Sequence, residues 1–481
     1  MDRLAHTIEV LEASAQRRLE ELFEFLRIPS VSTLPERRED VRRAAWWLKD
    51  ACERAGLAAS VLETDGHPVV FAQRRGPEGA PTVLVYGHYD VQPAEPLDDW
   101  RSPPFEPVVR DGNIYARGAS DDKGQALCWI QAAGAWTRAE GGLPVTLKVL
   151  MEGEEEIGSP NLERWIAEHR ALLQADCVAV SDSDQAAPGL PALTYGLRGL
   201  VYLEVRVRGA SRDLHSGAFG GGIMNPIQAL CDILSRLKDP ASGRVLVDGF
   251  YDRVRPLADW EREAFRALPH DDEKYRSELG APMLYGEQGY TTIERTTARP
   301  TLDICGIFGG FQGPGAKTVL PSLAGAKVSM RLVPDQRADE IAEAFVRTVR
   351  RLAPKEVEVE VGPPERFGPA GKKDARPGGA DPVILERDTP WARAAEAALE
   401  RGFGAKPAFI RAGGSIPVVL TFKRVLGLDC VLMGYGLKDD AAHAPNEKLC
   451  LEDYHRGCRA SAAFLVEVAA RAGRRERAKT P

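Results

Sequence analysis

The stretch PTVLVYGHYD, residues 81–90, joins an uninterrupted apolar run to a histidine and a carboxylate. Two similar apolar runs, VTLKVLM at 145–151 and DCVAVSD at 176–182, follow it and are separated by helical patterns. Short strands that are apolar on both faces and alternate with helices are typical of a doubly wound, largely parallel sheet. We therefore predict an α/β fold, which resumes in the buried-strand pattern LDCVLMGYG at 428–436.

Polar residues stand directly after these apolar runs. His88 and Asp90 follow the first run, Glu155 follows the second and Asp182 ends the third. Because ligands gather at the C-terminal ends of strands in such folds, we expect these side chains to converge. Imidazole and carboxylate groups together bind zinc and hard divalent cations. Alternation along the extended chain points His88 and Asp90 the same way, so we predict that Asp90 holds the imidazole from behind.

The pattern changes after Gly199. The stretch LVYLEVRVRG, which begins at residue 200, alternates apolar and polar residues strictly, as do AKVSMRLVP at 326–334 and EVEVEVG at 356–362. This period of two indicates a sheet with one solvated face. Helices are predicted from Pro226 and over residues 338–352.

These two patterns predict two domains. An inserted α+β domain of ferredoxin-like type, over residues 200–381, divides a catalytic domain into residues 1–199 and 382–481. The Gly-, Pro- and Lys-rich text from Gly362 to Pro382 is the predicted linker back. Residues 251–299 fit neither pattern and are predicted to be a helical addition to the insert, with no chemistry assigned.

Composition restricts the class of protein. The net charge of −7 argues against a nucleic-acid partner. No apolar run approaches the about 20 residues that cross a bilayer. Residues 1–26 are predicted to form one amphipathic helix without the apolar centre of a signal peptide. The 8 cysteines lack metal-binding spacing, so we expect reduced thiols and a cytoplasmic protein.

Nine motifs occur along the chain in this order: GHYDVQP, GASDDKG, EGEEEIGS, VSDSD, DLHSG, GAKTVLP, RLVP, GGSIP and HAPNE. Each is weak evidence alone, since single histidines are mostly structural and acidic runs are mostly solvated. In combination they resemble the dinuclear metallopeptidase family that includes carnosine dipeptidase, glutamate carboxypeptidase, aminoacylase, acetylornithine deacetylase and succinyl-diaminopimelate desuccinylase. The likeness covers nearly the whole chain, and TYGLRG and the size of the insert bring it nearest to the cytosolic non-specific and carnosine-type dipeptidases.

The resemblance implies two divalent metal ions, zinc first, with manganese or cobalt as alternatives. Its ligands, carried over by position, are His88, Asp121 and Asp182 for one ion and Asp121, Glu156 and His443 for the other. Glu155 would be the general base that deprotonates water. Asp122 would be structural, at a point where the family often has a cis peptide bond, and Glu154 is predicted to be solvated.

The same likeness assigns substrate recognition to the insert and implies a homodimer. His215 would reach the partner's active site and stabilise the oxyanion. From the residues alone, Arg331 is predicted to be a solvated arginine on a strand. By the resemblance, Arg331 would bind the substrate carboxylate, assisted by Thr318 and Ser415. His443 would also contact the substrate. Ala412 stands where many relatives carry an acidic residue, which leaves the preferred N-terminal group of the substrate open.

The leading hypothesis is a cytoplasmic, homodimeric metallo-dipeptidase that acts on small peptides, without nucleic-acid or membrane partners. One alternative is a deacylase of N-acetyl or N-succinyl amino acids, since both reactions cleave an amide beside a carboxylate. Another is a binding or scaffold protein that kept the fold and lost the chemistry. The filled ligand positions and Glu155 argue against this last alternative.

Overall fold

The computed structural model describes residues 2–367 and 378–479, which form two compact units. The first comprises Met1–Tyr195, Leu385–Ile410 and Pro417–Pro481, and the second comprises Gly196–Ile384 and Arg411–Ile416. The short segment Arg411–Ile416 thus groups with the insert, although we predicted it within the catalytic domain. Residues 368–377 of the predicted linker lie outside the described residues.

The first unit is built on a mixed sheet whose four central strands are parallel. In sheet order these are β6 (Thr146–Glu152), β3 (Thr82–His88), β7 (Cys177–Val180) and β18 (Asp429–Gly434). On one side β2 (Val69–Arg74) pairs antiparallel with β6, and β1 (Ala58–Leu62) pairs antiparallel with β2. On the other side β8 (Ala192–Leu197) pairs antiparallel with β18, and β16 (Val383–Ile384) and β17 (Ala408–Ala412) pair with β8. The predicted mixed α/β fold is confirmed.

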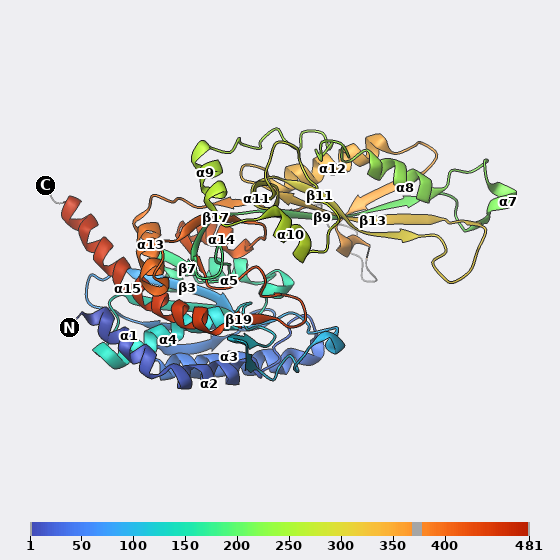
Figure 1. The fold of residues 1–481 in the computed structure, drawn as a ribbon. Coiled ribbons are helices and arrows are strands. Elements are labelled where there is room, and N and C mark those ends of the chain that lie inside the picture. The colour runs from blue at the N-terminus through green and yellow to red at the C-terminus, as the bar shows by residue number, and fades with distance from the viewer. Residues whose placement is uncertain (1, 368–377, 480–481) are drawn as a thin grey trace. The chain divides into compact units, whose positions relative to one another are not determined.

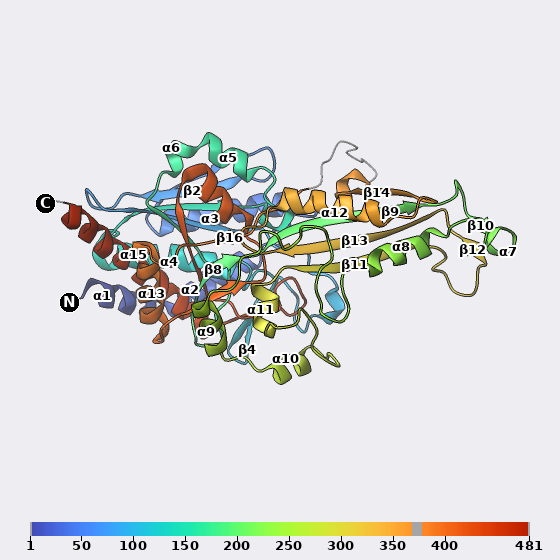
Figure 2. The ribbon, with the colours of Figure 1, turned by 90° about the horizontal axis from the view of Figure 1, so that it is seen from above.

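Both faces of this sheet are covered, which explains why its strands are apolar throughout. Val83 and Val85 of β3 belong to a core shared with α4 (Lys123–Glu140), α13 (Pro390–Phe403) and α15 (Leu451–Lys479). On the opposite face, Tyr86 packs edge-on against Phe422, with ring centroids 5.6 Å apart. Figure 2 shows α5 (Leu162–Glu168) on the other side of the strands from α13 and α15.

The N-terminal region forms two helices, so the prediction of one continuous helix is wrong. α1 (Arg3–Ala13) and α2 (Ala15–Leu26) are separated at Ser14. The Ser14 hydroxyl donates to the carbonyl oxygens of Val10 at 2.7 Å and Leu11 at 3.2 Å. Serine side chains compete in this way for main-chain groups, which weakens a helix interior.

The second unit has the strand–helix–strand–strand–helix–strand order of a ferredoxin-like fold. Its elements are β9 (Gly199–Arg208), α8 (Pro226–Ser235), β11 (Thr301–Gly309), β13 (Leu323–Leu332), α12 (Ala338–Leu352) and β14 (Glu358–Gly362). The antiparallel sheet order is β11-β13-β9-β14, which is the order of a ferredoxin-like fold, so the predicted fold class of the insert is confirmed. Val201 and Val205 are fully buried under α8 and α12, which lie on one face of the sheet (Figure 1).

Residues 251–299 form the predicted helical addition. It contains α9 (Asp259–Ala267), α10 (Asp272–Glu278) and α11 (Thr292–Thr297). Thr291 and Glu294 form a capping box at the start of α11. Arg299, the last residue of the helical addition, forms a bidentate ion pair with Glu287, at 2.7 and 2.8 Å. A helix long and apolar enough for a bilayer is absent from the described part of the chain.

Candidate metal centre and substrate-binding residues

The four parallel strands bring the predicted ligands to one edge of the sheet. His88 is the last residue of β3, and Glu155 and Glu156 lie in the turn after β6. Asp182 follows β7 by two residues, and His443 lies in the loop after β18. Asp121 precedes α4, whose first turn lies at the same edge. The predicted convergence at strand ends is therefore a feature of the fold.

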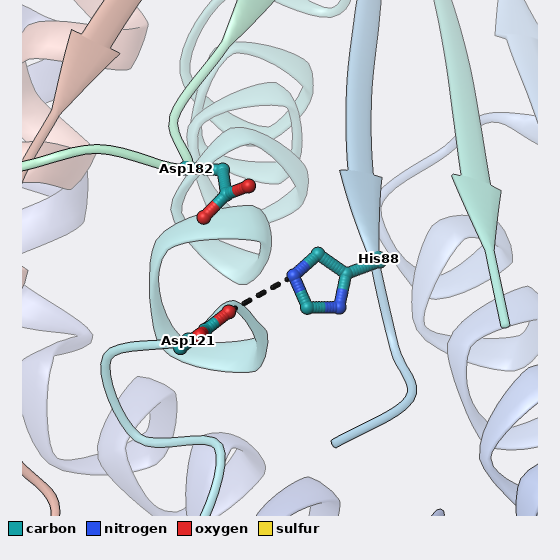
Figure 3. A group of neighbouring side chains, drawn as sticks. All are labelled: His88, Asp121 and Asp182. Atoms are coloured by element: carbon teal, nitrogen blue, oxygen red, sulfur yellow. Dashed lines mark hydrogen bonds and ion pairs between the residues drawn. The ribbon is translucent and has the colours of Figure 1, made fainter. Parts of the chain in front are cut away.

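Two groups of side chains in this cluster have the geometry of metal-ligand sets. In the first, ligand atoms of His88, Asp121 and Asp182 all lie within 4.8 Å of one another. Figure 3 shows the carboxylates of Asp121 and Asp182 facing the same space as the imidazole of His88. The His88 Nε2 atom lies 3.0 Å from Asp121 Oδ1.

The second group consists of Asp121, Glu156 and His443, also within 4.8 Å. The His443 Nε2 atom lies 2.9 Å from Asp121 Oδ2 and 3.2 Å from Glu156 Oε2. Asp121 thus turns one carboxylate oxygen to each group, the arrangement expected of a bridging ligand. His443 has a left-handed backbone, with φ of 63°, which is uncommon outside glycine and frequent at functional sites.

The charges of the cluster match the requirements of divalent cations. Burial raises the pKa of Glu155 to about 9 and the pKa of Asp182 to about 7. Hydrogen bonds to Asp121 and Glu156 raise the pKa of His443 to about 10. Burial lowers the pKa of His88, but its hydrogen bonds to Asp121 and Asp90 outweigh this and raise the pKa well above its usual value. This buried excess of carboxylates, with imidazole nitrogens beside them, fits a pair of divalent metal ions.

Asp90 contacts the imidazole of His88 through its main-chain oxygen and not, as predicted, through its carboxylate. The His88 Nδ1 atom lies 3.1 Å from the main-chain oxygen of Asp90, whereas the nearest carboxylate oxygen is 3.5 Å away. The Asp90 carboxylate instead accepts hydrogen bonds from the main-chain N–H groups of Glu155 at 3.2 Å and Glu156 at 3.1 Å. One buried residue therefore orients both His88 and the turn that carries Glu155.

Glu154 and Glu155 occupy different environments although they are adjacent. Glu154 is buried, and its carboxylate accepts hydrogen bonds from the His67 N–H at 3.0 Å and from Asn161 Nδ2 at 2.8 Å. The prediction that Glu154 is solvated is wrong, because the His67 N–H and Asn161, two residues after the motif EGEEEIGS, donate to its carboxylate. Glu155 is half-buried beside the two ligand groups.

Asp122 follows Asp121 through a cis peptide bond and is fully buried. Its Oδ2 atom accepts a hydrogen bond from the His88 N–H at 3.2 Å. Gly87 permits this approach, since a Cβ atom at residue 87 would lie 2.8 Å from the same oxygen. Asp122 thus ties the Asp121 turn to the end of β3.

Glu447 is a structural element of the site that the sequence analysis did not single out. Its fully buried carboxylate accepts hydrogen bonds from Arg117 Nη1 at 2.8 Å and from the N–H groups of Gly118 at 2.9 Å, Ser120 at 2.9 Å and Asp121 at 3.0 Å. Glu447 therefore fastens the Asp121 turn to the loop that carries His443. Its place in HAPNE, four residues after the histidine, was the available signal.

The second unit places His215 beside Thr318. β10 (Leu214–His215) pairs with β12 (Val319–Leu320), and the Ser216 N–H donates to the Thr318 carbonyl oxygen at 3.1 Å. The Gly217 N–H donates to His215 Nδ1 at 3.0 Å. This contact selects the neutral tautomer that carries its proton on Nε2, so the exposed ring presents a hydrogen-bond donor.

Arg331 and Ser415 also meet within the second unit. Arg331 Nη1 donates to Ser415 Oγ at 3.4 Å, and both residues are half-buried. Ala412 ends β17 (Ala408–Ala412), three residues before Ser415. The five predicted ligands and Glu155 thus gather in the first unit, while the remaining substrate residues form two pairs in the second.

Comparison with known proteins agrees with this geometry. Residues 84–467 match the pattern of Peptidase family M20/M25/M40. The Cys-Gly metallodipeptidase DUG1 of Candida albicans is 33% identical, over 96% of both chains. Human carnosine dipeptidase 1 superimposes with a TM-score of 0.84 at 31% identity, covering 98% of this chain and 99% of that one. The M20 family metallo-carboxypeptidase Sso-CP2 of Sulfolobus solfataricus has a TM-score of 0.82 at 32% identity, over 94% and 99%. The predicted resemblance is confirmed, and the chain belongs to peptidase family M20/M25/M40.

Proposed function

We propose that this protein is a metallo-dipeptidase. The observation that carries the proposal is the pair of ligand groups that share Asp121, with the carboxylate of Glu155 beside them and in neither group. The relatives named as a Cys-Gly metallodipeptidase and as carnosine dipeptidase support a dipeptide as the substrate. His88, Asp121 and Asp182 would hold one ion, and Asp121, Glu156 and His443 the other.

The two ligand groups would hold divalent cations, whose Lewis acidity would make water more acidic and would polarise the scissile carbonyl group. The residues of the chain perform the remaining tasks. Glu155 takes the proton from the attacking water and passes it to the leaving amine. Asp90 holds the main-chain N–H groups of Glu155 and Glu156, so the base stays at a constant position relative to the ligands.

Substrate recognition falls to the second unit. Arg331, assisted by Ser415 and Thr318, binds the terminal carboxylate of the substrate through its planar guanidinium group. His215 donates from Nε2 to the developing oxyanion, in the active site of the partner subunit of a homodimer. His443, exposed enough to reach a ligand, contacts the substrate as well.

Three finer assignments complete the proposal. Zinc would be the preferred metal because imidazole and carboxylate ligands suit it, with manganese or cobalt as substitutes. A homodimer is required if His215 acts in trans. A cytoplasmic location is supported by the cysteines, all 8 of which lie within the described residues as free thiols.

A second candidate function is carboxypeptidase activity on longer peptides, which the similarity to a metallo-carboxypeptidase favours. It differs from dipeptidase activity only in the length of peptide on the N-terminal side of the scissile bond. The deacylase alternative differs in having an acyl group there instead of an amino acid.

The test is chelator treatment followed by zinc or manganese add-back, with four substrates assayed side by side. These are a dipeptide, the tripeptide extended at its N-terminus, and the matching N-acetyl and N-succinyl amino acids. We expect activity to vanish with the metal, to return with it, and to be highest on the dipeptide. Full activity of the stripped enzyme would refute the metal-dependent mechanism, and a preference for the tripeptide or the acyl substrates would select an alternative.

A further inference from the structure

Arg198, in the motif TYGLRG, holds the segment that carries Ser415 through both its main chain and its side chain. The Arg198 N–H donates to the Gly414 carbonyl oxygen at 3.1 Å, and Arg198 Nε donates to the Gly413 carbonyl oxygen at 2.9 Å. The Ser415 hydroxyl in turn donates to the Arg198 carbonyl oxygen. Three consecutive residues of one segment are therefore attached to one arginine.

The guanidinium groups of Arg198 and Arg331 form no ion pair with a carboxylate among the described residues. The acceptors of Arg198 are the carbonyl oxygens of Gly413 and Arg299, and the acceptor of Arg331 is the Ser415 hydroxyl. Burial lowers the pKa of Arg198 to about 10, and the positive charge of Arg331 contributes to this. The Asp303 carboxylate is close enough to act on both charges but forms no ion pair with either guanidinium group, and a partly buried pair of like charges with no direct ion pair favours an anionic ligand.

The helical addition over residues 251–299 holds the same segment from its other side. Its last residue, Arg299, offers its carbonyl oxygen to Arg198 Nη1 at 3.5 Å. The Thr296 carbonyl oxygen lies so near residue 413 that an added Cβ atom there would approach it to 2.7 Å. Glu261 of α9 forms a buried ion pair with Arg411 at the start of the segment.

We propose that Arg198 is a positioning residue for carboxylate recognition, and that the helical addition over residues 251–299 holds the segment Arg411–Ile416 in place. Arg198 acts through Ser415, whose hydroxyl it keeps against Arg331. This inference rests on the proposed function, because it assumes that Arg331 binds the terminal carboxylate of the substrate. It assigns a role to a region whose sequence suggested none.

The experiment measures KM and kcat of the metal-loaded enzyme for a dipeptide and for the same dipeptide with a C-terminal amide. In R198K the charge remains, but a single ammonium group cannot replace the planar set of donors. We expect KM for the free dipeptide to rise about ten- to a hundredfold, with kcat changed less than about threefold. For the amide substrate, kcat/KM of R198K should equal that of the unaltered enzyme.

Two further variants keep the test decisive if R198K folds poorly. Gly413→Ala crowds the Thr296 carbonyl oxygen and should raise KM for the free dipeptide in the same selective way. Glu261→Gln weakens the anchor at Arg411 and should cause a smaller rise. Arg276→Gln is the matched control, because Arg276 lies in the same helical addition and contacts Glu273 and the Ala281 carbonyl oxygen instead; its KM should not change.

Two outcomes would overturn the inference while leaving the proposed function intact. One is an unchanged KM in a folded R198K enzyme, and the other is an equal loss on the free and amidated dipeptides. If the unaltered, metal-loaded enzyme cleaves no dipeptide, the proposed function itself fails. The two failures are therefore distinguishable.

Discussion

The two units carry opposite electrostatic imbalances. In the first, four carboxylates surround two imidazoles: Asp121, Glu155, Glu156 and Asp182 with His88 and His443. In the second, Arg198 and Arg331 have carbonyl and hydroxyl partners and no described carboxylate ion pair. The first arrangement fits cations and the second fits an anion. This difference agrees with the proposed function, in which the first unit binds the metal ions and the second unit binds the carboxylate of the substrate.

The units also differ in how the functional side chains are held. Buried carboxylates fix the first cluster, since Asp90 and Glu447 accept hydrogen bonds from the main chain beside the ligands. In the second unit, Arg198 fixes Ser415 by donating to main-chain carbonyl oxygens. Changes in the first unit should therefore alter metal content or chemistry, and changes in the second should alter substrate affinity.

The largest expected effect breaks the first cluster at its shared ligand. Asp121→Asn should remove both ions together and lower turnover about a thousandfold or more, because several kcal/mol of charge stabilisation are lost. Elemental analysis and dipeptide turnover measure the two losses. Asp439→Asn is the control, since Asp439 is exposed and pairs with Lys448, and it should leave both quantities unchanged. A variant of Asp121 that retains both ions would contradict the bridging assignment.

The next effect separates chemistry from metal binding within the same unit. Glu155→Gln should keep the metal content and lower kcat about 10²- to 10⁴-fold, because the general base is lost. Glu154→Gln tests its neighbour, which holds His67 and Asn161 instead. It should cost about 1–3 kcal/mol of unfolding free energy and spare kcat. Near-normal turnover in the Glu155 variant would exclude this residue as the base.

A third prediction concerns the support of the first cluster. Glu447→Gln removes the negative charge beside Arg117, and its NH2 group faces either the Arg117 and Gly118 donors or the Ser120 and Asp121 donors, so the unfolding free energy should fall by about 3 kcal/mol. Urea denaturation in excess chelator measures this loss without the contribution of the metal. Metal affinity, measured by chelator competition, should fall about tenfold. An unchanged affinity would mean that Glu447 supports the fold alone.

The smallest effect sharpens the contrast between the units. Arg331→Gln should raise KM for a dipeptide about ten- to a hundredfold, because a charged hydrogen bond to the substrate carboxylate is lost. Its metal content should equal that of the unaltered protein. Steady-state kinetics together with elemental analysis checks both statements, and a loss of metal in this variant would erase the distinction between the two units.

Much of the fold and of the candidate site could be predicted because the relevant signals are local. Apolar runs preceding His88 and Asp182 indicated parallel strands, and the period of two from residue 200 indicated the ferredoxin-like sheet. The ligand candidates followed from residue type and from their place after the strands. The break at Ser14 was missed, because the apolar stripe continues across it and only the serine hydroxyl marks the change.

The sequence by itself determined which segments are strands and helices, which family the chain resembles, and which side chains are able to bind a cation. Only the tertiary structure decided which of two adjacent glutamates is buried, which oxygen of Asp90 meets His88, and what Glu447 and Arg198 hold. The physical reason is distance along the chain. Periodicity records burial within about ten residues, whereas the Glu447 carboxylate meets the N–H of Ser120 across 327 positions, and only the folded chain brings them together.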